Sequence, residues 1–176
     1  DQQFKLVING RSVAADSSFD VFNPSNGEVV AKAPKATIMQ LDEAVAAAQS
    51  AFATWSKADD TTRRDACVAI ADTLRDNAEE LAQLLTLEPG KPLNGMGSRF
   101  EMGGAEAWAR HTASLELPMK VLQDDNQGRV ELHRKPIGVV GSITPWNWPL
   151  MIAISHIVPA IRTGNTVVIK PSPLTP

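Results

Sequence analysis

The residues from Gly138 to Pro176 constrain the fold more than any other part of the chain. A short apolar, β-branched run over 139–143 is typical of a strand that is buried on both faces. Pro145 and Pro149 end this run, and Pro149 can open a helix because its missing N–H costs nothing in a first turn. A second apolar run follows at 166–169. Two such strands joined by a helix predict a βαβ crossover and therefore a parallel sheet.

Polar residues gather at the two places where these expected strands end. One group is Thr144 to Asn147, and the other is Lys170 to Ser172. Ligands of open parallel sheets bind beyond the carboxyl ends of the strands. The topology therefore predicts a site for a nucleotide or a similar ligand.

Asn147 and Lys170 are the two residues of this site with the clearest chemistry. A turn between two prolines holds the Asn147 amide rigidly, so its NH2 group can donate toward a developing oxyanion. Alternatively, this amide only satisfies backbone groups of the turn. Lys170 follows the second strand, where dinucleotide folds read the adenosine ribose, so it can donate to ribose hydroxyls or pair with a 2′-phosphate. The alternative for Lys170 is a solvated lysine at a strand end.

The rest of the chain divides by the period of its apolar residues. The first 33 residues contain Asn-Gly and Asn-Pro turns, which predict small antiparallel hairpins. Helical spacing then predicts helices from about 39 to 55, 61 to 75, 77 to 88 and 93 to 112. We expect Asp60 or Thr61 to cap the second of these helices, and Asn77 with Glu80 to form a capping box on the third.

Four further residue types are possible functional candidates because of their chemistry. Cys67 falls on an apolar helical stripe, so we expect a buried, inert thiol. The three histidines have no metal-ligand spacing, so we expect no metal site. Lys91 is expected to be a solvated loop residue, and Trp108 is expected to pack rather than to form a platform for substrate.

Composition narrows the class of protein. The 176 residues are 43% hydrophobic and 21% charged, which is ordinary for a soluble globular protein. A net charge of −3 argues against nucleic-acid binding, and the absence of a long apolar run argues against a membrane span. One cysteine and an N-terminus without a secretory pattern favour a cytoplasmic location.

The order of residues closely resembles the aldehyde dehydrogenase superfamily. The resemblance is carried by Pro136-Ile-Gly-Val-Val-Gly-Ser-Ile-Thr-Pro-Trp-Asn-Trp-Pro-Leu150 and by Lys170-Pro-Ser172. Further matches lie upstream, at 23–29, 44–48, 52–55 and 90–93. Members of the family are much longer, so the chain looks like the amino-terminal third of such an enzyme.

The resemblance implies an α/β fold that begins a Rossmann-like parallel-sheet cofactor domain. Residues 1–117 would supply its N-terminal hairpins and helices, and residues 136–176 its first βαβ unit. Residues 118–135 would form a protruding antiparallel hairpin that serves oligomerisation, as a homodimer or homotetramer. A hairpin that packs on its own domain is the alternative. The catalytic domain would be absent from the chain.

The resemblance also implies roles for single residues. The asparagine matching Asn147 holds the thiohemiacetal oxyanion together with the backbone N–H of the catalytic cysteine. The residues expected to bind NAD or NADP are Ile143, Thr144, Pro145, Trp146, Asn147, Lys170, Pro171, Ser172 and Pro173, with Lys170 and Ser172 at the adenosine ribose. The nucleophile and the general base would lie beyond Pro176, so this chain alone is expected to be inactive.

Three positions depart from the family pattern. Trp148 replaces the usual phenylalanine, and His156 stands where many members have lysine. Pro173 replaces a glutamate that hydrogen-bonds the ribose hydroxyls and repels a 2′-phosphate, so the choice between NAD and NADP stays open.

The apolar residues Leu150, Met151 and Ile152 begin a helix that lines the substrate tunnel in relatives.

The sequence thus favours part of an NAD(P)-dependent enzyme that oxidises an aldehyde to a carboxylic acid. Two alternatives stay open. One is a non-catalytic assembly or binding module, and the other is an acylating relative that produces a coenzyme A thioester. A cysteine and a glutamate beyond Pro176 would distinguish the three.

Overall fold

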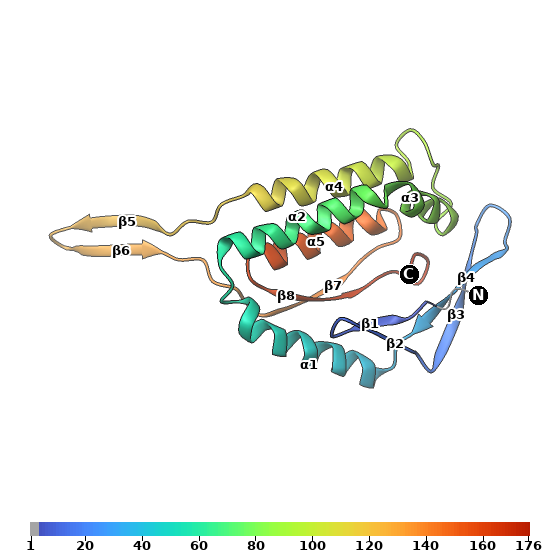
Figure 1. The fold of residues 1–176 in the computed structure, drawn as a ribbon, viewed down its shortest axis with the longest axis horizontal. Coiled ribbons are helices and arrows are strands. Elements are labelled where there is room, and N and C mark those ends of the chain that lie inside the picture. The colour runs from blue at the N-terminus through green and yellow to red at the C-terminus, as the bar shows by residue number, and fades with distance from the viewer. Residues whose placement is uncertain (1–3) are drawn as a thin grey trace.

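A computed structural model describes residues 4–176. The N-terminal part contains four strands, followed by four helices, a hairpin and a final strand–helix–strand unit (Figure 1). The elements are β1 Leu6–Ile8, β2 Arg11–Val13, β3 Ser17–Phe22, β4 Val29–Lys35, α1 Ile38–Trp55, α2 Asp60–Asp76, α3 Ala78–Leu87, α4 Ser98–Ser114, β5 Lys120–Asp125, β6 Gly128–Leu132, β7 Val139–Ile143, α5 Pro149–Arg162 and β8 Thr166–Lys170.

The predicted βαβ crossover is confirmed. Strands β7 and β8 are parallel, and their register runs from Val139 opposite Thr166 to Ile143 opposite Lys170. Figure 1 shows the pair between two layers, with α1 on one side and α5, α2 and α4 on the other. The fold is therefore α/β, as the sequence predicted, and helices lie on both faces of the parallel pair.

Local sequence explains the ends of α5. Pro149 is its first residue, and Gly164, with a φ of 84°, follows the C-cap in a conformation that glycine adopts without strain. Asn165 then ties the two strands together at their beginnings: its Oδ1 accepts hydrogen bonds from the backbone N–H of Ile137 at 2.6 Å and of Gly138 at 3.0 Å.

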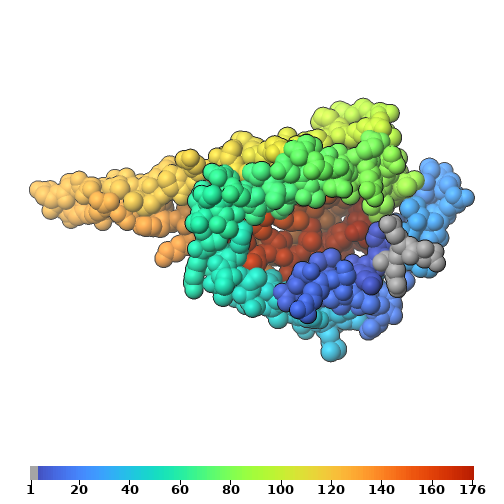
Figure 2. Space-filling model, in the orientation of Figure 1, coloured from blue at the N-terminus to red at the C-terminus, as the bar shows by residue number. Residues whose placement is uncertain are grey.

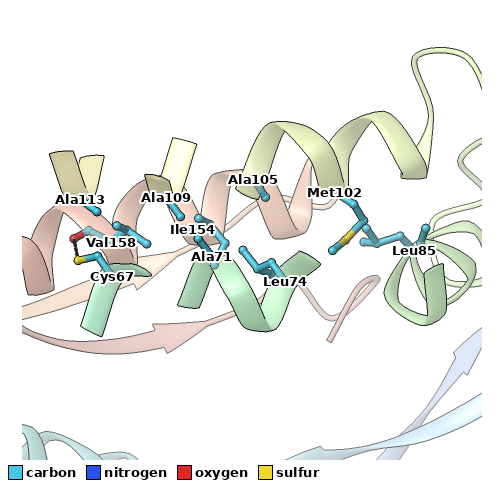
Figure 3. Packing of buried hydrophobic residues seen from close by; sticks show 11 residues of the cluster. Cys67, Ala71, Leu74, Leu85, Met102, Ala105, Ala109, Ala113, Ile154 and Val158 are labelled. Carbon is cyan, nitrogen blue, oxygen red and sulfur yellow. Dashed lines mark hydrogen bonds between the residues drawn. The ribbon is translucent and has the colours of Figure 1, made fainter. Parts of the chain in front are cut away.

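The core lies where α2, α4 and α5 pack together (Figure 3). Alanines from α2 and α4 line this contact and let the helix backbones approach closely; they include Ala71, Ala105 and Ala109. Cys67 is fully buried among them, and its Sγ lies 3.8 Å from the backbone oxygen of Val158. The prediction that this thiol is buried is therefore confirmed. Burial also raises the pKa of the Cys67 thiol, which disfavours the reactive thiolate.

Arg162, the last residue of α5, connects this helix to α4 and α2 at one end of the core. Its guanidinium donates to the backbone oxygens of Ala113 at 3.2 Å and Leu115 at 2.7 Å, where α4 ends. It also forms a bidentate ion pair with Asp60 in the first turn of α2, at 2.6 and 3.1 Å. The hydrogen bond from Arg162 lowers the pKa of Asp60.

We expect Arg162→Met to destabilise the protein by about 2–4 kcal/mol, because it leaves the buried backbone oxygen of Ala113 and the partly buried one of Leu115 without their donor. Arg64→Met is the matched control, since Arg64 is exposed and pairs only with the adjacent Asp65, and it should change stability by about 0.5 kcal/mol or less. Thermal and urea unfolding measure both effects. Equal effects of the two substitutions would contradict this account of Arg162.

The predicted hairpins are present. Strands β1 and β2 join at Asn9 and Gly10, which both have positive φ, and β3 pairs with β4 around the 23–27 turn. Strands β5 and β6 form a hairpin that projects away from the helical layers (Figure 1). Its turn is tight, because pairing continues to Asp125 opposite Gly128.

Several predicted helix ends were wrong. Asp59, rather than Asp60 or Thr61, caps α2, and its side chain accepts from the Thr62 N–H at 2.7 Å. Asn77 forms no capping box, because its amide donates back to the Thr73 oxygen at 2.8 Å and so belongs to the end of α2. The only side-chain capping box among the described helices joins Thr37 and Gln40 at the start of α1, which sequence reasoning missed.

Two other expectations need correction. Helix α4 begins at Ser98, five residues later than expected, because Gly95 has a φ of 66° and residues 92–97 form a loop. The expected apolar face of α1 is covered only in part: Leu41 and Val45 are 50% and 42% exposed, whereas Ala48, Phe52 and Trp55 are half-buried. No α1 residue is buried within the part of the chain that the structure describes.

Candidate active site

The two strand tips that the sequence singled out lie side by side. Ile143 and Lys170 are register partners at the ends of β7 and β8. One residue further on, the Thr144 N–H donates to the Lys170 oxygen at 3.2 Å, so the strands are still joined where they end. The parallel pairing therefore places the residues after β7 and those after β8 at the same edge of the sheet.

The turn after β7 presents Asn147 to solvent. Pro145, Trp146 and Asn147 are all exposed, and within residues 4–176 the Asn147 side chain makes no hydrogen bond. The alternative in which this amide satisfies the backbone of its own turn is therefore not what the structure shows. Thr144 is different, because its Oγ1 is buried and has no hydrogen-bond partner in the described part of the chain.

The turn after β8 is ordered by Ser172. Its Oγ accepts a hydrogen bond from the Leu174 N–H at 3.2 Å, and its backbone oxygen accepts from the Thr175 N–H at 3.1 Å. Ser172 is 8% exposed, whereas Lys170 and Pro173 are exposed. Thus Lys170 is free to reach a ligand, while Ser172 shapes the turn.

A groove of about 300 Å³ brings Trp146 and Pro173 together. Its other side comes from parts of the chain that sequence reasoning did not connect with the site, namely the β3–β4 hairpin and the loop after α3; the lining residues are Asp20, Val21, Phe22, Pro24, Glu88, Pro89, Trp146, Pro173 and Leu174. Burial raises the pKa of Glu88 to about 7. Figure 2 shows the red C-terminal segment at the bottom of a recess between the layers.

A second groove, of about 360 Å³, lies along α4 and α5. It is mostly apolar and aromatic, with lining residues Phe100, Trp108, Trp148, Met151, Ile152 and Ser155. Trp108 was expected to pack, but it is 42% exposed and forms part of this groove. Because Trp148 and Met151 flank the start of α5, this groove is close in the chain to Asn147.

Sequence reasoning missed a buried ion pair behind the Asn147 turn. Lys91 pairs with Glu101 of α4, and their side chains are 12% and 0% exposed. The expectation that Lys91 is a solvated loop residue was therefore wrong. This ion pair could not be predicted from the sequence, because its two residues lie in separate segments. Nothing around Lys91 in the 90–92 loop, or around Glu101 on the glycine-rich helix α4, indicates the other residue as a partner.

His156 has a specific partner in place of the lysine of the family pattern. Its Nδ1 lies 2.8 Å from the hydroxyl of Ser142 on β7.

No group of three or more metal-ligating side chains gathers among residues 4–176. None of the helices described is long and apolar enough to cross a membrane.

Comparison with known proteins decides the family. The profile described as the aldehyde dehydrogenase family matches residues 12–176, which is nearly the whole chain. The chain belongs to the aldehyde dehydrogenase family. The resemblance noted in its turn and strand-end residues is thereby confirmed.

Individual aldehyde dehydrogenases match along the same length. A mitochondrial aldehyde dehydrogenase of Leishmania tarentolae is 36% identical over an alignment of 178 positions, which covers 99% of this chain and 36% of that protein. A phenylacetaldehyde dehydrogenase of Pseudomonas fluorescens is 33% identical, over 98% of this chain and 36% of that protein. This member of the family therefore spans about a third of the length of those relatives.

A solved aldehyde dehydrogenase shares the fold. The betaine aldehyde dehydrogenase of Staphylococcus aureus, crystallised in complex with NAD+, superposes with a TM-score of 0.92 at 32% identity. The superposition covers 99% of this chain and 36% of that one. The α/β fold described above is thus the fold of an aldehyde dehydrogenase segment.

Proposed function

We propose that this chain is the amino-terminal part of an NAD(P)-dependent enzyme that oxidises an aldehyde to a carboxylic acid. The observation that carries the proposal is the edge shared by β7 and β8, where the exposed Asn147 follows β7 and the exposed Lys170 ends β8. In open parallel sheets this edge binds nucleotides. Membership of the aldehyde dehydrogenase family and a similar enzyme solved with NAD+ support it.

The residues at this edge fit a dinucleotide. Thr144 has a buried hydroxyl without a partner among the described residues, which is costly unless a ligand or water satisfies it. Lys170 is exposed and can donate to ribose hydroxyls. We propose that one wall of the NAD(P) site is formed by Ile143, Thr144, Pro145, Trp146, Asn147, Lys170, Pro171, Ser172 and Pro173. The bound cofactor would accept the hydride of the aldehyde.

Asn147 would act on the oxygen of the aldehyde. As a nucleophile adds to the carbonyl carbon, the carbonyl π electrons move onto this oxygen, which becomes negatively charged. The Asn147 NH2 group can donate a hydrogen bond to it, and a donor that is already aimed needs no reorganisation in the transition state. The nucleophile, which the family pattern makes a cysteine, would come from a part of the enzyme outside these 176 residues.

The substrate proposal follows from the aromatic groove along α4 and α5. Its walls from Phe100, Trp108 and Trp148 offer apolar surface close to the turn that carries Asn147. Such walls favour aldehydes with an aliphatic or aromatic body, because burying apolar ligand surface against them is favourable, whereas a polar ligand group would find few hydrogen-bond partners there.

The β5–β6 hairpin supports a proposal for assembly. It stands clear of the helical layers, and apolar side chains on it, including Val121 and Leu132, are 45% and 38% exposed (Figure 1). We propose that a second copy of the protein covers it in a homodimer or homotetramer. Sedimentation of the full-length protein tests this, and a monomer would contradict it.

Steady-state assay of the full-length protein tests the proposed function. We expect NADH or NADPH to form with an apolar aldehyde, and the carboxylic acid to accumulate without coenzyme A. A thioester that forms only with coenzyme A would instead identify the acylating alternative. Absence of turnover with any aldehyde, in protein that binds no dinucleotide, would identify a non-catalytic module.

Pro173→Glu tests the cofactor wall in the full-length protein. We expect the ratio of NAD affinity to NADP affinity to rise by about tenfold, because a carboxylate beside the ribose accepts from its hydroxyls and repels a 2′-phosphate. Pro118→Glu, on the exposed segment between α4 and β5, is the matched control and should leave the ratio unchanged. Titration with both dinucleotides measures the ratio, and an unchanged ratio for Pro173→Glu would place the ribose elsewhere.

A further inference from the structure

The first turn of α5 is capped by a side chain from another helix. Its N-cap residue, Trp148, offers no side-chain hydrogen bond, so the free N–H groups of the turn need another acceptor. Glu101 of α4 supplies it. One of its carboxylate oxygens, Oε1, accepts from the N–H of Leu150 at 2.9 Å and from that of Met151 at 3.0 Å.

The other carboxylate oxygen of Glu101 is held by Lys91. The ammonium group of Lys91 also lies 3.8 Å from the centre of the Trp148 ring, which is a cation–π contact. Phe100, the neighbour of Glu101, meets the same ring edge-on, with ring centres 6.0 Å apart. The side chain that follows Asn147 in the sequence is therefore fixed from two directions, and the helix that begins after it is fixed by Glu101.

The contacts of Glu101 are not explained by a stabilising role alone. A buried ion pair is weak evidence for a stabilising role, because apolar residues of the same volume often stabilise a fold as well. Here one carboxylate with 0% exposure satisfies two backbone donors and one cation at once. Those donors lie three and four residues after Asn147, with the rigid Trp148-Pro149 step between. Moving the start of α5 would therefore move the Asn147 backbone.

We propose that Glu101, assisted by Lys91, is a positioning residue that fixes the direction in which the Asn147 amide points. The inference rests on the proposed function, in which that amide donates to the aldehyde oxygen. Glu101 itself touches neither substrate nor cofactor in this scheme. It acts through the α5 backbone, so its loss should lower the rate of the chemical step and leave dinucleotide binding intact.

A double-mutant cycle in the full-length enzyme tests the proposal. We expect Glu101→Ala to lower kcat by about 10- to 100-fold, since a misplacement of about 1 Å can cost this much, with the dissociation constant for NAD(P) unchanged. In an Asn147→Ala background the same substitution should cost about twofold or less, because nothing is left to position. Losses that multiply would overturn the proposal, since Glu101 would then act independently of Asn147.

A double variant with a neutral pair in place of Glu101 and Lys91 separates the hydrogen bonds that cap α5 from the effect of the buried charges. Glu101→Gln with Lys91→Met keeps an oxygen that accepts from both N–H groups and leaves no unpaired buried cation. We expect this double variant to retain kcat within about fivefold of the wild type, well above Glu101→Ala. A loss as large as that of Glu101→Ala would overturn the capping role. Where the alanine variant does not fold, Glu101→Asp, which is one methylene shorter, replaces it in the cycle.

Hydrogen exchange of the same full-length variants gives a readout that does not depend on activity. The amides of Trp148, Leu150 and Met151 should exchange faster in Glu101→Ala and at the wild-type rate in the neutral pair. Unchanged exchange in Glu101→Ala would overturn the proposal. Full activity of Asn147→Ala would instead reject the proposed role of that amide, and the exchange result would still decide whether Glu101 holds the turn.

Discussion

Asn147→Ala in the full-length enzyme should lower kcat for aldehyde oxidation by about 10² to 10³-fold, the usual effect of removing one donor from an oxyanion site. The affinity for NAD(P) should change far less than kcat, because most of the proposed cofactor wall is formed by other residues of the turns after β7 and β8. The exposed amide makes no hydrogen bond within residues 4–176, so its removal should leave the melting temperature nearly unchanged.

Gln83→Ala is the matched control for this substitution. Gln83 is also an exposed amide, but it lies on α3 and bonds only to Glu79 one turn earlier. It should leave kcat within about twofold of the wild type. Pre-steady-state measurement of hydride transfer assigns any loss to the chemical step. If Asn147→Ala slows that step no more than Gln83→Ala does, the amide is not the oxyanion donor.

Gly97→Ala should destabilise the protein by about 4 kcal/mol or more, which is the range of severe backbone clashes. A Cβ at Gly97 would lie 1.7 Å from the Pro92 backbone oxygen and 2.8 Å from that of Asn94. The first of these atoms cannot withdraw easily, because it accepts the Ser98 N–H at 2.8 Å. The 92–97 loop would have to refold, and Lys91 directly precedes it.

Gly103→Ala is the control, since Gly103 lies on the exposed side of the same helix region and nothing is within 4 Å of the added Cβ. It should stabilise α4 by about 0.5–1 kcal/mol, because alanine is the better helix former. Urea unfolding of both variants of the full-length protein measures the difference. Similar unfolding midpoints for the two would show that the loop can adapt to a side chain at Gly97.

The strand–helix–strand unit could be predicted because its signals are local. The run before Pro145, the proline at the start of α5 and the glycine after it each act on their own neighbours, and together they give the observed β7, α5 and β8. The parallel register follows from that connection. Hence the positions of Asn147 and Lys170 at one sheet edge were accessible from sequence alone.

The surroundings of the site could not be predicted because they depend on contacts between distant segments. Glu101 and Leu150 are 49 residues apart, and no pattern near either residue indicates the hydrogen bond between them. The groove beside Trp146 likewise combines the β3–β4 hairpin with the loop at Glu88. The wrong cap positions at α2 and α3 had a simpler cause, since adjacent polar residues compete for the same role.

The projecting β5–β6 hairpin has a thermodynamic consequence. Two strands without a covered face are at best marginally ordered in water, and every β6 residue is exposed. Any chain that covers this ribbon therefore contributes to its folding as well as binding to it. Dilution alone would then loosen residues 120–132, and the melting temperature would rise with protein concentration.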